Sequence, residues 1–218
     1  MNIHFQKGVP LEYKVVSQDE AGRKNGKNTV FSTFFHPFPL FTFVTMRQAI
    51  FLTGFNNWGK SSLIFELFGN QTRFWHGYTY GIVGVNFTIQ FTVQSQSNDD
   101  LGPDYVDKII ERLGGAPDGG DHLFSALCPS LEEGNSFVEI LTHDPFTTYD
   151  RLHLLLLEFK WEHNARLLIN NIVQAGQRIH NAQFHVINAD QALTNDDQRW
   201  NAKLAQIRGT LNNIFGTP

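Results

Sequence analysis

From residue 46 onward, apolar segments of strand length alternate with segments of helix length. The clearest strand is Leu152–Phe159, which is almost continuously apolar, as expected for a parallel strand buried on both faces. The clearest helix is Asn195–Phe215, where apolar residues recur every three or four positions. Regular alternation is typical of a parallel sheet whose right-handed crossovers place helices on both faces. The pattern predicts an α/β fold, a three-layer α/β/α sandwich with a mostly parallel sheet of about five strands.

The remaining elements follow from the same periodicities. Further strands are expected at Ala49–Thr53, Asn86–Gln94, His122–Cys128 and Phe184–Ile187. Further helices are expected at Ser61–Phe68, Pro103–Leu113, Leu131–Leu141 and Glu162–Ala175. Two predictions are specific about burial. Alternation in Asn86–Gln94 predicts one buried face, and the helix Glu162–Ala175 is expected to bury Leu167, Leu168, Asn171, Ile172 and Ala175.

Composition limits the class of protein. The chain has 218 residues, of which 41% are hydrophobic and 17% charged, which suits one globular domain. Its net charge of −4 argues against direct contact with nucleic acid. Its single cysteine, Cys128, excludes an internal disulfide and suits a reducing compartment, so we expect a cytoplasmic protein.

Residues 1–45 differ from the rest of the chain. They contain seven of the 20 phenylalanines and carry a charge of +2, which leaves −6 on the remainder. The aromatic run Thr29–Val44 contains Pro37 and Pro39, which exclude a regular helix or central strand, and it is too short and interrupted for a membrane span. We expect an extension upstream of a true start at Met46; an extra hairpin or a flexible arm that binds a partner are alternatives. The folded domain is then 46–218.

A glycine-rich loop follows the first predicted strand. Its residues are Gly54, Phe55, Asn56, Asn57, Trp58, Gly59, Lys60 and Ser61, which fit G-x-x-x-x-G-K-[ST] between a strand and a helix. The glycines permit close approach of the backbone to an anion, and successive N–H groups at a helix start would surround the β-phosphate of a nucleotide. Lys60 is expected to reach the β- and γ-phosphates, Ser61 to bind Mg²⁺ and Ser62 to contact the α-phosphate.

In this loop the chain resembles the P-loop NTPase superfamily. The resemblance covers Gly54–Ser62 in motif and residues 46–218 in the order of elements. It implies binding of ATP, or less expectedly GTP, together with Mg²⁺. The element order is similar to the ParA/MinD-like ATPases and to small kinases. ParA-like proteins usually carry a second lysine where this chain has Phe55, which puts their paired-lysine dimer chemistry in doubt.

A working NTPase also needs a carboxylate near the metal, usually at the end of a buried strand. Glu158 follows four leucines and is the best match, although it could instead be a surface acid paired with Lys160. Cys128-Pro129-Ser130 stands where some families place an aspartate. Asp99 and Asp100 follow another predicted strand and could also face the phosphates, since loops at the carboxyl ends of parallel strands open on the ligand side.

Other residues are weaker candidates. Asn188, at the end of the last predicted strand, could contact a base, and Asp190 could accept a hydrogen bond from guanine. Trp58 could stack on a base or pack against neighbouring aromatic residues. A transition-state arginine could be any of Arg73, Arg112 and Arg166. Cys128 has no nucleophile motif around it and is expected to be a small buried thiol.

Three functions follow. The leading hypothesis is a Mg²⁺-dependent ATPase in which Lys60 and Glu158 assist hydrolysis, acting as a switch through protein partners and a nucleotide-dependent homodimer. The first alternative is a small-molecule or nucleotide kinase; the scarcity of arginine in residues 95–121, where only Arg112 occurs, argues against it. The second is a module that binds nucleotide without turnover.

Overall fold

Five parallel strands form the centre of the protein. The computed structural model describes residues 46–114 and 122–216, and the predictions for residues 1–45 lie outside these ranges. The sheet has the order β2-β3-β1-β4-β5, and every neighbouring pair is parallel. The strands are β1 (Gln48–Thr53), β2 (Phe91–Gln94), β3 (His122–Leu127), β4 (Arg151–Leu157) and β5 (Ala182–Ile187).

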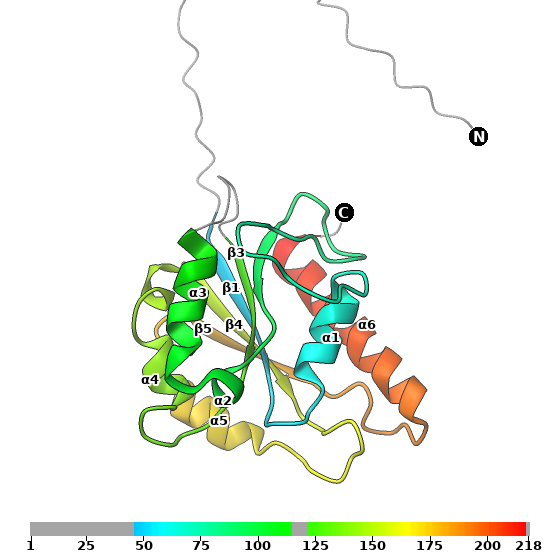
Figure 1. Cartoon of the computed structure of the whole chain (residues 1–218). Helices are drawn as coiled ribbons and strands as arrows, with labels where there is room; N and C mark the ends of the chain where they lie inside the picture. Colours follow the sequence, from blue (N-terminus) through cyan, green and yellow to red (C-terminus); the bar gives the residue numbers. More distant parts are fainter. Residues whose placement is uncertain (1–45, 115–121, 217–218) are drawn as a thin grey trace, which may run out of the picture. The chain divides into compact units, whose positions relative to one another are not determined.

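Helices cover both faces of this sheet, which confirms the three-layer α/β/α prediction (Figure 1). One face carries α1 (Lys60–Leu67) and α6 (Asp196–Phe215). The other carries α3 (Tyr105–Gly114), α4 (Phe137–Leu141) and α5 (Ile169–Gly176). The short helix α2 (Asn98–Leu101) lies beyond the end of β2, and single 3-10 turns occur at Gly102–Asp104 and Phe146–Thr148.

Strand β1 has a hydrogen-bonded neighbour on each side. Thr53 is level with Leu127 of β3 and with Leu156 of β4, so three carboxyl ends meet at Gly54. The Gly54 N–H donates to Leu127 O at 3.1 Å, which ties the chain that leaves β1 to the end of β3. The register therefore fixes where the loop after β1 begins.

The prediction of a strand at Asn86–Gln94 is wrong for the first half of that segment. Only Phe91–Gln94 pairs in the sheet, and the side chain of Phe87 is 78% exposed rather than buried. Asn86 Oδ1 accepts hydrogen bonds from the backbone N–H and the hydroxyl of Thr88, which is a local turn. A short polar side chain that bonds to nearby backbone competes with strand pairing, and here that turn prevails.

Two expected helices are shorter than their patterns predict. The segment before α5 folds back on itself through an antiparallel bridge between Phe159 and Arg166, so the helix starts at Ile169 and not at Glu162. Leu168 is consequently 66% exposed, against the predicted burial, and Asn171 is exposed as well. The helix expected at 131–141 forms only as α4, because Gly134 adopts a left-handed conformation (φ 75°) that interrupts it.

Edge-to-face aromatic packing builds one part of the core. The ring of Phe68 lies 5.3 Å from that of Phe124, 5.4 Å from Phe74 and 6.1 Å from Phe91, each nearly perpendicular to it. Aromatic pairs in this geometry stabilise the fold by more than the burial of their apolar area alone. The high phenylalanine content of the sequence thus has a packing role in the described part of the chain.

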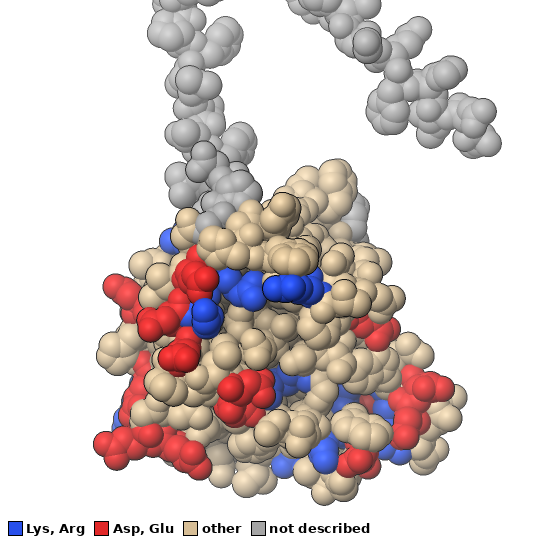
Figure 2. Space-filling view, viewed as in Figure 1, with Lys and Arg blue, Asp and Glu red and all other residues tan. Residues whose placement is uncertain are grey.

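The surface in the orientation of Figure 1 is mostly uncharged. Basic and acidic side chains form separate small groups on this face, with no continuous basic area (Figure 2). Among the described residues, no helix combines the length and apolar character needed to cross a bilayer.

Two glycines in helices give a matched test of the packing. A Cβ added at Gly176 of α5 would lie 2.5 Å from Phe184 Cζ, whereas one added at Gly209 of α6 would have nothing within 4 Å. We expect Gly176→Ala to lower the free energy of unfolding by about 1–3 kcal/mol through overpacking. Gly209→Ala should raise it by about 0.5–1 kcal/mol because alanine favours helix. Urea unfolding measures both, and a stabilised Gly176→Ala protein would contradict this packing.

Acid should weaken the fold through a histidine pair in the sheet. His153 Nδ1 lies 3.1 Å from His185 Nε2, and His153 Nε2 lies 2.9 Å from Gln48 Oε1. Burial, with smaller contributions from His185 and Arg151, lowers the pKa of His153 from 6.5 to about 4. The unfolded chain then binds more protons between these values, so stability falls as the pH drops through this window.

For His153 alone the loss between pH 7 and pH 5 is about 2 kcal/mol. Urea titrations of the wild type and of His153→Gln at both pH values measure it. The variant should lose less stability on acidification than the wild type. The same loss in both proteins would show that His153 does not carry this dependence.

Candidate functional site

The loop from Gly54 to Ser61 joins β1 to α1. Asn57 and Gly59 have left-handed backbone conformations, with φ of 61° and 80°, which turn the chain tightly before the helix begins at Lys60. A Cβ on Gly59 would lie 3.2 Å from Trp200 Cζ3 of α6, so a larger residue there would strain the backbone and press on that indole. At Gly59 both the backbone conformation and the nearby indole therefore favour glycine, as the sequence predicts for the loop glycines.

Several backbone N–H groups of this loop have no acceptor within the described part of the protein. Backbone hydrogen bonds stop at the Gly54 N–H and resume at the Leu63 N–H, which donates to Gly59 O at 2.9 Å. Apart from the Trp58 N–H, which belongs to the turn at Asn56–Asn57, the N–H groups of residues 55–62 donate to no acceptor among the described residues. Unpaired N–H groups at a helix start carry partial positive charge, and the α1 dipole adds to it. The loop is thus a ready site for an anion.

Lys60 lies inside the loop rather than in solvent. Its side chain is 5% exposed, and its Nζ donates to Phe55 O at 2.9 Å. The same ammonium lies 3.7 Å from Asp99 Oδ1. A buried ammonium with one carbonyl acceptor and one nearby carboxylate keeps spare hydrogen-bonding capacity, because an ammonium has three donors. Lys60 is therefore placed to bind an anion in the loop.

Ser61 points toward the end of β2. Its hydroxyl donates to Ser95 O at 2.7 Å. A hydroxyl that donates its hydrogen in this way keeps its lone pairs free, which suits the predicted contact with Mg²⁺. Ser62 is exposed at the start of α1. The other predicted loop residues differ in burial: Trp58 is buried, and Asn56 and Asn57 are exposed.

Asp99 is the carboxylate that the structure brings to Lys60. The Ser97 hydroxyl donates to Asp99 Oδ1, while Asp99 Oδ2 is buried and has no hydrogen-bond partner among the described residues. Asp100 instead accepts from the Ser97 N–H at 3.0 Å and completes the capping box of α2. Of the two aspartates considered from the sequence, only Asp99 faces the loop.

Glu158 lies elsewhere at this edge of the sheet. Its side chain is 7% exposed, and Oε1 accepts from Arg166 Nε at 2.8 Å and from Arg166 Nη2 at 2.5 Å. Its Oε2 accepts from Asn188 Nδ2 at 3.0 Å. No hydrogen bond or ion pair among the described residues joins Glu158 to Lys60 or Ser61. The structure thus brings Glu158 and Asn188 together, and Glu158 is bonded to Arg166 and Asn188.

Asp190 belongs to a buried charged cluster. It is 0% exposed, and its Oδ2 lies 2.9 Å from Lys203 Nζ and 2.7 Å from His163 Nε2. Burial lowers the pKa of Lys203, and the bond to Asp190 opposes that effect. The cluster joins the end of β5 to α6 and to the turn before α5. Its burial separates the Asp190 carboxylate from solvent and from any ligand there.

The end of β3 is held by an amide that sequence reasoning missed. Asn98 is fully buried; its Oδ1 accepts from the Cys128 N–H at 2.7 Å, and its Nδ2 donates to Asn135 Oδ1 at 2.9 Å. The signal in the sequence is the pattern Ser97-x-x-Asp100, which is typical of a helix start and places Asn98 and Asp99 in its first turn. The candidate arginines Arg73 and Arg112 bind other groups, the Trp75 ring and Phe74 O.

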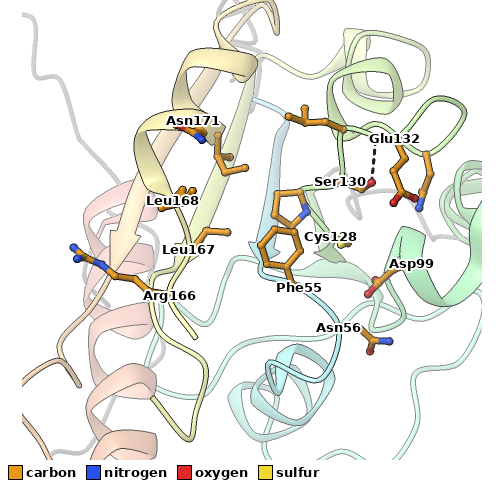
Figure 3. A pocket seen from close by; sticks show the side chains of 14 residues that line it. Phe55, Asn56, Asp99, Cys128, Ser130, Glu132, Arg166, Leu167, Leu168 and Asn171 are labelled. Carbon is orange, nitrogen blue, oxygen red and sulfur yellow. Dashed lines mark hydrogen bonds between the residues drawn. The ribbon is translucent and has the colours of Figure 1, made fainter. Parts of the chain in front are cut away.

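A cavity of about 900 Å³ opens beside the loop. It lies between the segment after β3 and the start of α5, with Phe55 and Asp99 on its wall (Figure 3). Its apolar lining includes Phe55, Pro129, Leu131, Leu167, Leu168 and Ile172. Its polar lining includes Asn56, Asp99, Cys128, Ser130, Glu132, Asn135, Arg166 and Asn171.

Comparisons with protein-family models, with curated proteins and with solved structures find no match to this chain.

The thiol of Cys128 gives a sensitive test of the site. Burial, reinforced by the Asp99 carboxylate and opposed by Lys60, raises its pKa from 9.0 to about 11. At pH 8 the folded protein should therefore react with a disulfide reagent such as Ellman's reagent about 100-fold more slowly than the protein in urea, because the thiolate is the nucleophile. This is the one cysteine of the chain, so the assay reports a single site. Equal rates in buffer and in urea would contradict this environment.

Proposed function

We propose that the protein binds a Mg²⁺–nucleoside triphosphate, ATP in preference to GTP, at Gly54–Ser61 and cleaves its terminal phosphoanhydride bond. The observation that carries this proposal is the conjunction of unpaired N–H groups in this loop with the buried ammonium of Lys60. The N–H groups of this loop need acceptors that the protein does not supply, and the oxygens of a triphosphate would supply them. A loop that merely turned the chain would not need a lysine buried inside it.

The residues of the loop have distinct parts in this proposal. The N–H groups hold the β-phosphate, and Lys60 exchanges the Phe55 carbonyl for phosphate oxygens, where it offsets charge that develops on the γ-phosphoryl group. The Ser61 hydroxyl, and Asp99 through water, would hold Mg²⁺, which when bound neutralises phosphate charge. Asp99 takes the carboxylate role expected for Glu158, because Glu158 is bound to Arg166 and Asn188.

The preference for ATP is supported by the state of Asp190. A guanine base is usually recognised by a side chain that accepts hydrogen bonds from its N–H groups. Asp190 is the residue that the sequence suggests for this contact. Its carboxylate is fully buried against Lys203 and His163. The amide of Asn188, which bonds to Glu158 in this structure, is the remaining candidate for a base contact.

The proposal includes action through partners. A switch ATPase would couple nucleotide binding to protein partners and to a homodimer, with Phe55, 41% exposed at the loop, in place of the second lysine of ParA-like proteins. A single free and buried cysteine suits a reducing compartment such as the cytoplasm.

Binding is tested with a fluorescent ATP analogue in the presence and absence of Mg²⁺. Lys60→Ala should raise the dissociation constant about 100-fold, since it removes a charge-assisted bond to phosphate inside a buried site. The control is Lys108→Ala on α3, which removes the same charge from a side chain that is 52% exposed. It should bind within about twofold of the wild type.

Both variants are checked for folding by thermal unfolding, and phosphate release is measured in parallel. Equal affinities of the wild type and Lys60→Ala would refute the proposed phosphate site. Tight Mg²⁺–ATP binding without phosphate release would leave the protein a nucleotide-binding module and not an ATPase.

A further inference from the structure

Three polar side chains form a diagonal row across one face of the sheet. They are Gln48 of β1, His153 of β4 and His185 of β5. Gln48 is level with Arg151 on β4, and His153 is level with Gln183 on β5, so each member of the row lies two residues beyond the partner of the one before it. Residues two apart in a strand point to the same face. The row therefore shares one face of the sheet, the face that α6 covers (Figure 1).

The two imidazoles of this row face each other through nitrogen atoms. His153 Nδ1 lies 3.1 Å from His185 Nε2, while the ring centroids are 5.3 Å apart, so these two nitrogens lie between the rings. Two imidazole ligands on one tetrahedral Zn²⁺ ion, each with a Zn–N bond of about 2.0–2.1 Å, have nitrogens about 3.3 Å apart. A small outward shift of the His185 ring would therefore let both histidines bind one ion.

The carbonyl of Gln48 directs the lone pair of His153 toward this contact. Gln48 Oε1 lies 2.9 Å from His153 Nε2, and a carbonyl oxygen only accepts, so the proton of His153 is on Nε2 and its lone pair is on Nδ1. Metal-binding histidines usually donate their second ring N–H to a carbonyl or carboxylate, which fixes the tautomer and the orientation of the ring. Gln48 is thus a positioning residue for His153.

Both imidazoles are held in the neutral form, which is the form that binds a metal ion. Burial, with smaller contributions from His185 and Arg151, lowers the pKa of His153 to about 4. Burial lowers the pKa of His185 as well. Binding at neutral pH therefore releases no proton from these rings and requires only that His185 carry its proton on Nδ1 in place of Nε2.

The pair lies at the wall of a cavity of about 430 Å³ between the sheet and α6. His153 is buried and His185 is half-buried there. Arg151 is the one charged side chain among the described lining residues, and its charge opposes a bound cation, which makes the affinity moderate. The other polar lining residues are Gln48, Gln183, Thr210 and Asn213. A polar space of this size holds water molecules that can complete the coordination of an ion.

We propose that His153 and His185 bind one Zn²⁺ ion in this cavity, with water at the remaining positions. Neutral imidazole is a preferred ligand of zinc, whereas Mg²⁺ prefers oxygen. The described residues contain no group of three or more histidine, cysteine, aspartate or glutamate side chains placed to hold a metal ion, so the protein supplies two ligands here. The ion joins β4 to the edge strand β5. The row begins at the first residue of β1 and the phosphate loop follows its last, so this inference is independent of nucleotide binding.

The test is calorimetric titration of the full chain with Zn²⁺ and, separately, with Mg²⁺, in a buffer that does not bind metal ions. The wild type should bind Zn²⁺, and Zn²⁺ should raise its melting temperature because an ion that binds the folded state stabilises it. His153→Gln and His185→Gln should each weaken Zn²⁺ binding at least about tenfold, because each removes one of two protein ligands. The second variant keeps the test decisive if the buried His153 cannot be replaced without unfolding. Mg²⁺ should show no binding that depends on these histidines.

Two further variants separate the site from other histidines. Gln48→Leu keeps both ligands but removes the acceptor of His153 Nε2–H, and it should weaken binding about tenfold; an unchanged affinity would overturn its positioning role. The matched control His180→Gln removes an exposed imidazole outside the cavity and should bind within about twofold of the wild type. No Zn²⁺ binding by the wild type, or equal affinities of the wild type, His153→Gln and His185→Gln, would overturn the proposed site.

Discussion

The position of β1 at the centre of the sheet determines almost everything at the candidate site. It pairs with β3 on one side and β4 on the other, and residues Ala49–Thr53 are buried. Its carboxyl end therefore leaves the sheet between two other strand ends, all pointing the same way. The loop after Gly54 must turn within that narrow space, and the segments after β2, β3 and β4 enclose it.

Charge balance around Lys60 is the second constraint. An ammonium that is 5% exposed is stable only if acceptors replace the water it has lost. The Phe55 carbonyl and the Asp99 carboxylate do this, and burial together with the Asp99 carboxylate raises the pKa of the neighbouring Cys128 thiol. Three groups from three different segments are thus electrostatically coupled, although they are distant in the sequence.

The sequence predicted the layers well, and it also placed a turn between β1 and α1, because both depend on local patterns. Continuous burial of β4 and the apolar face of α6 follow from residue periodicity, and the turn at Gly59 follows from the need for a left-handed residue before α1. The prediction failed where a polar side chain forms a local turn in a segment whose residue pattern favours a strand. Asn86 forms a turn with Thr88 in place of the first half of a strand.

The carboxylate at the site could not be chosen from the sequence. Both candidates follow parallel strands: Glu158 comes directly after β4, and Asp99 lies in α2, after the end of β2. Whether a side chain faces Lys60 or Arg166 depends on the path of the chain beyond the strand, which the capping of α2 sets for Asp99 and the fold-back at Phe159 sets for Glu158. The exposed Leu168, which opens the cavity, results from the same fold-back.

The contact between Gly59 and Trp200 links the first loop of the domain to its last helix. The indole lies behind the left-handed turn, and its Nε1 also donates to Glu66 of α1, 134 residues away in the chain. The turn, α1 and α6 therefore form one mechanical unit. A change of backbone conformation at Gly59 would therefore alter the packing of Trp200, so the loop and the final helix of the domain are coupled through one side chain.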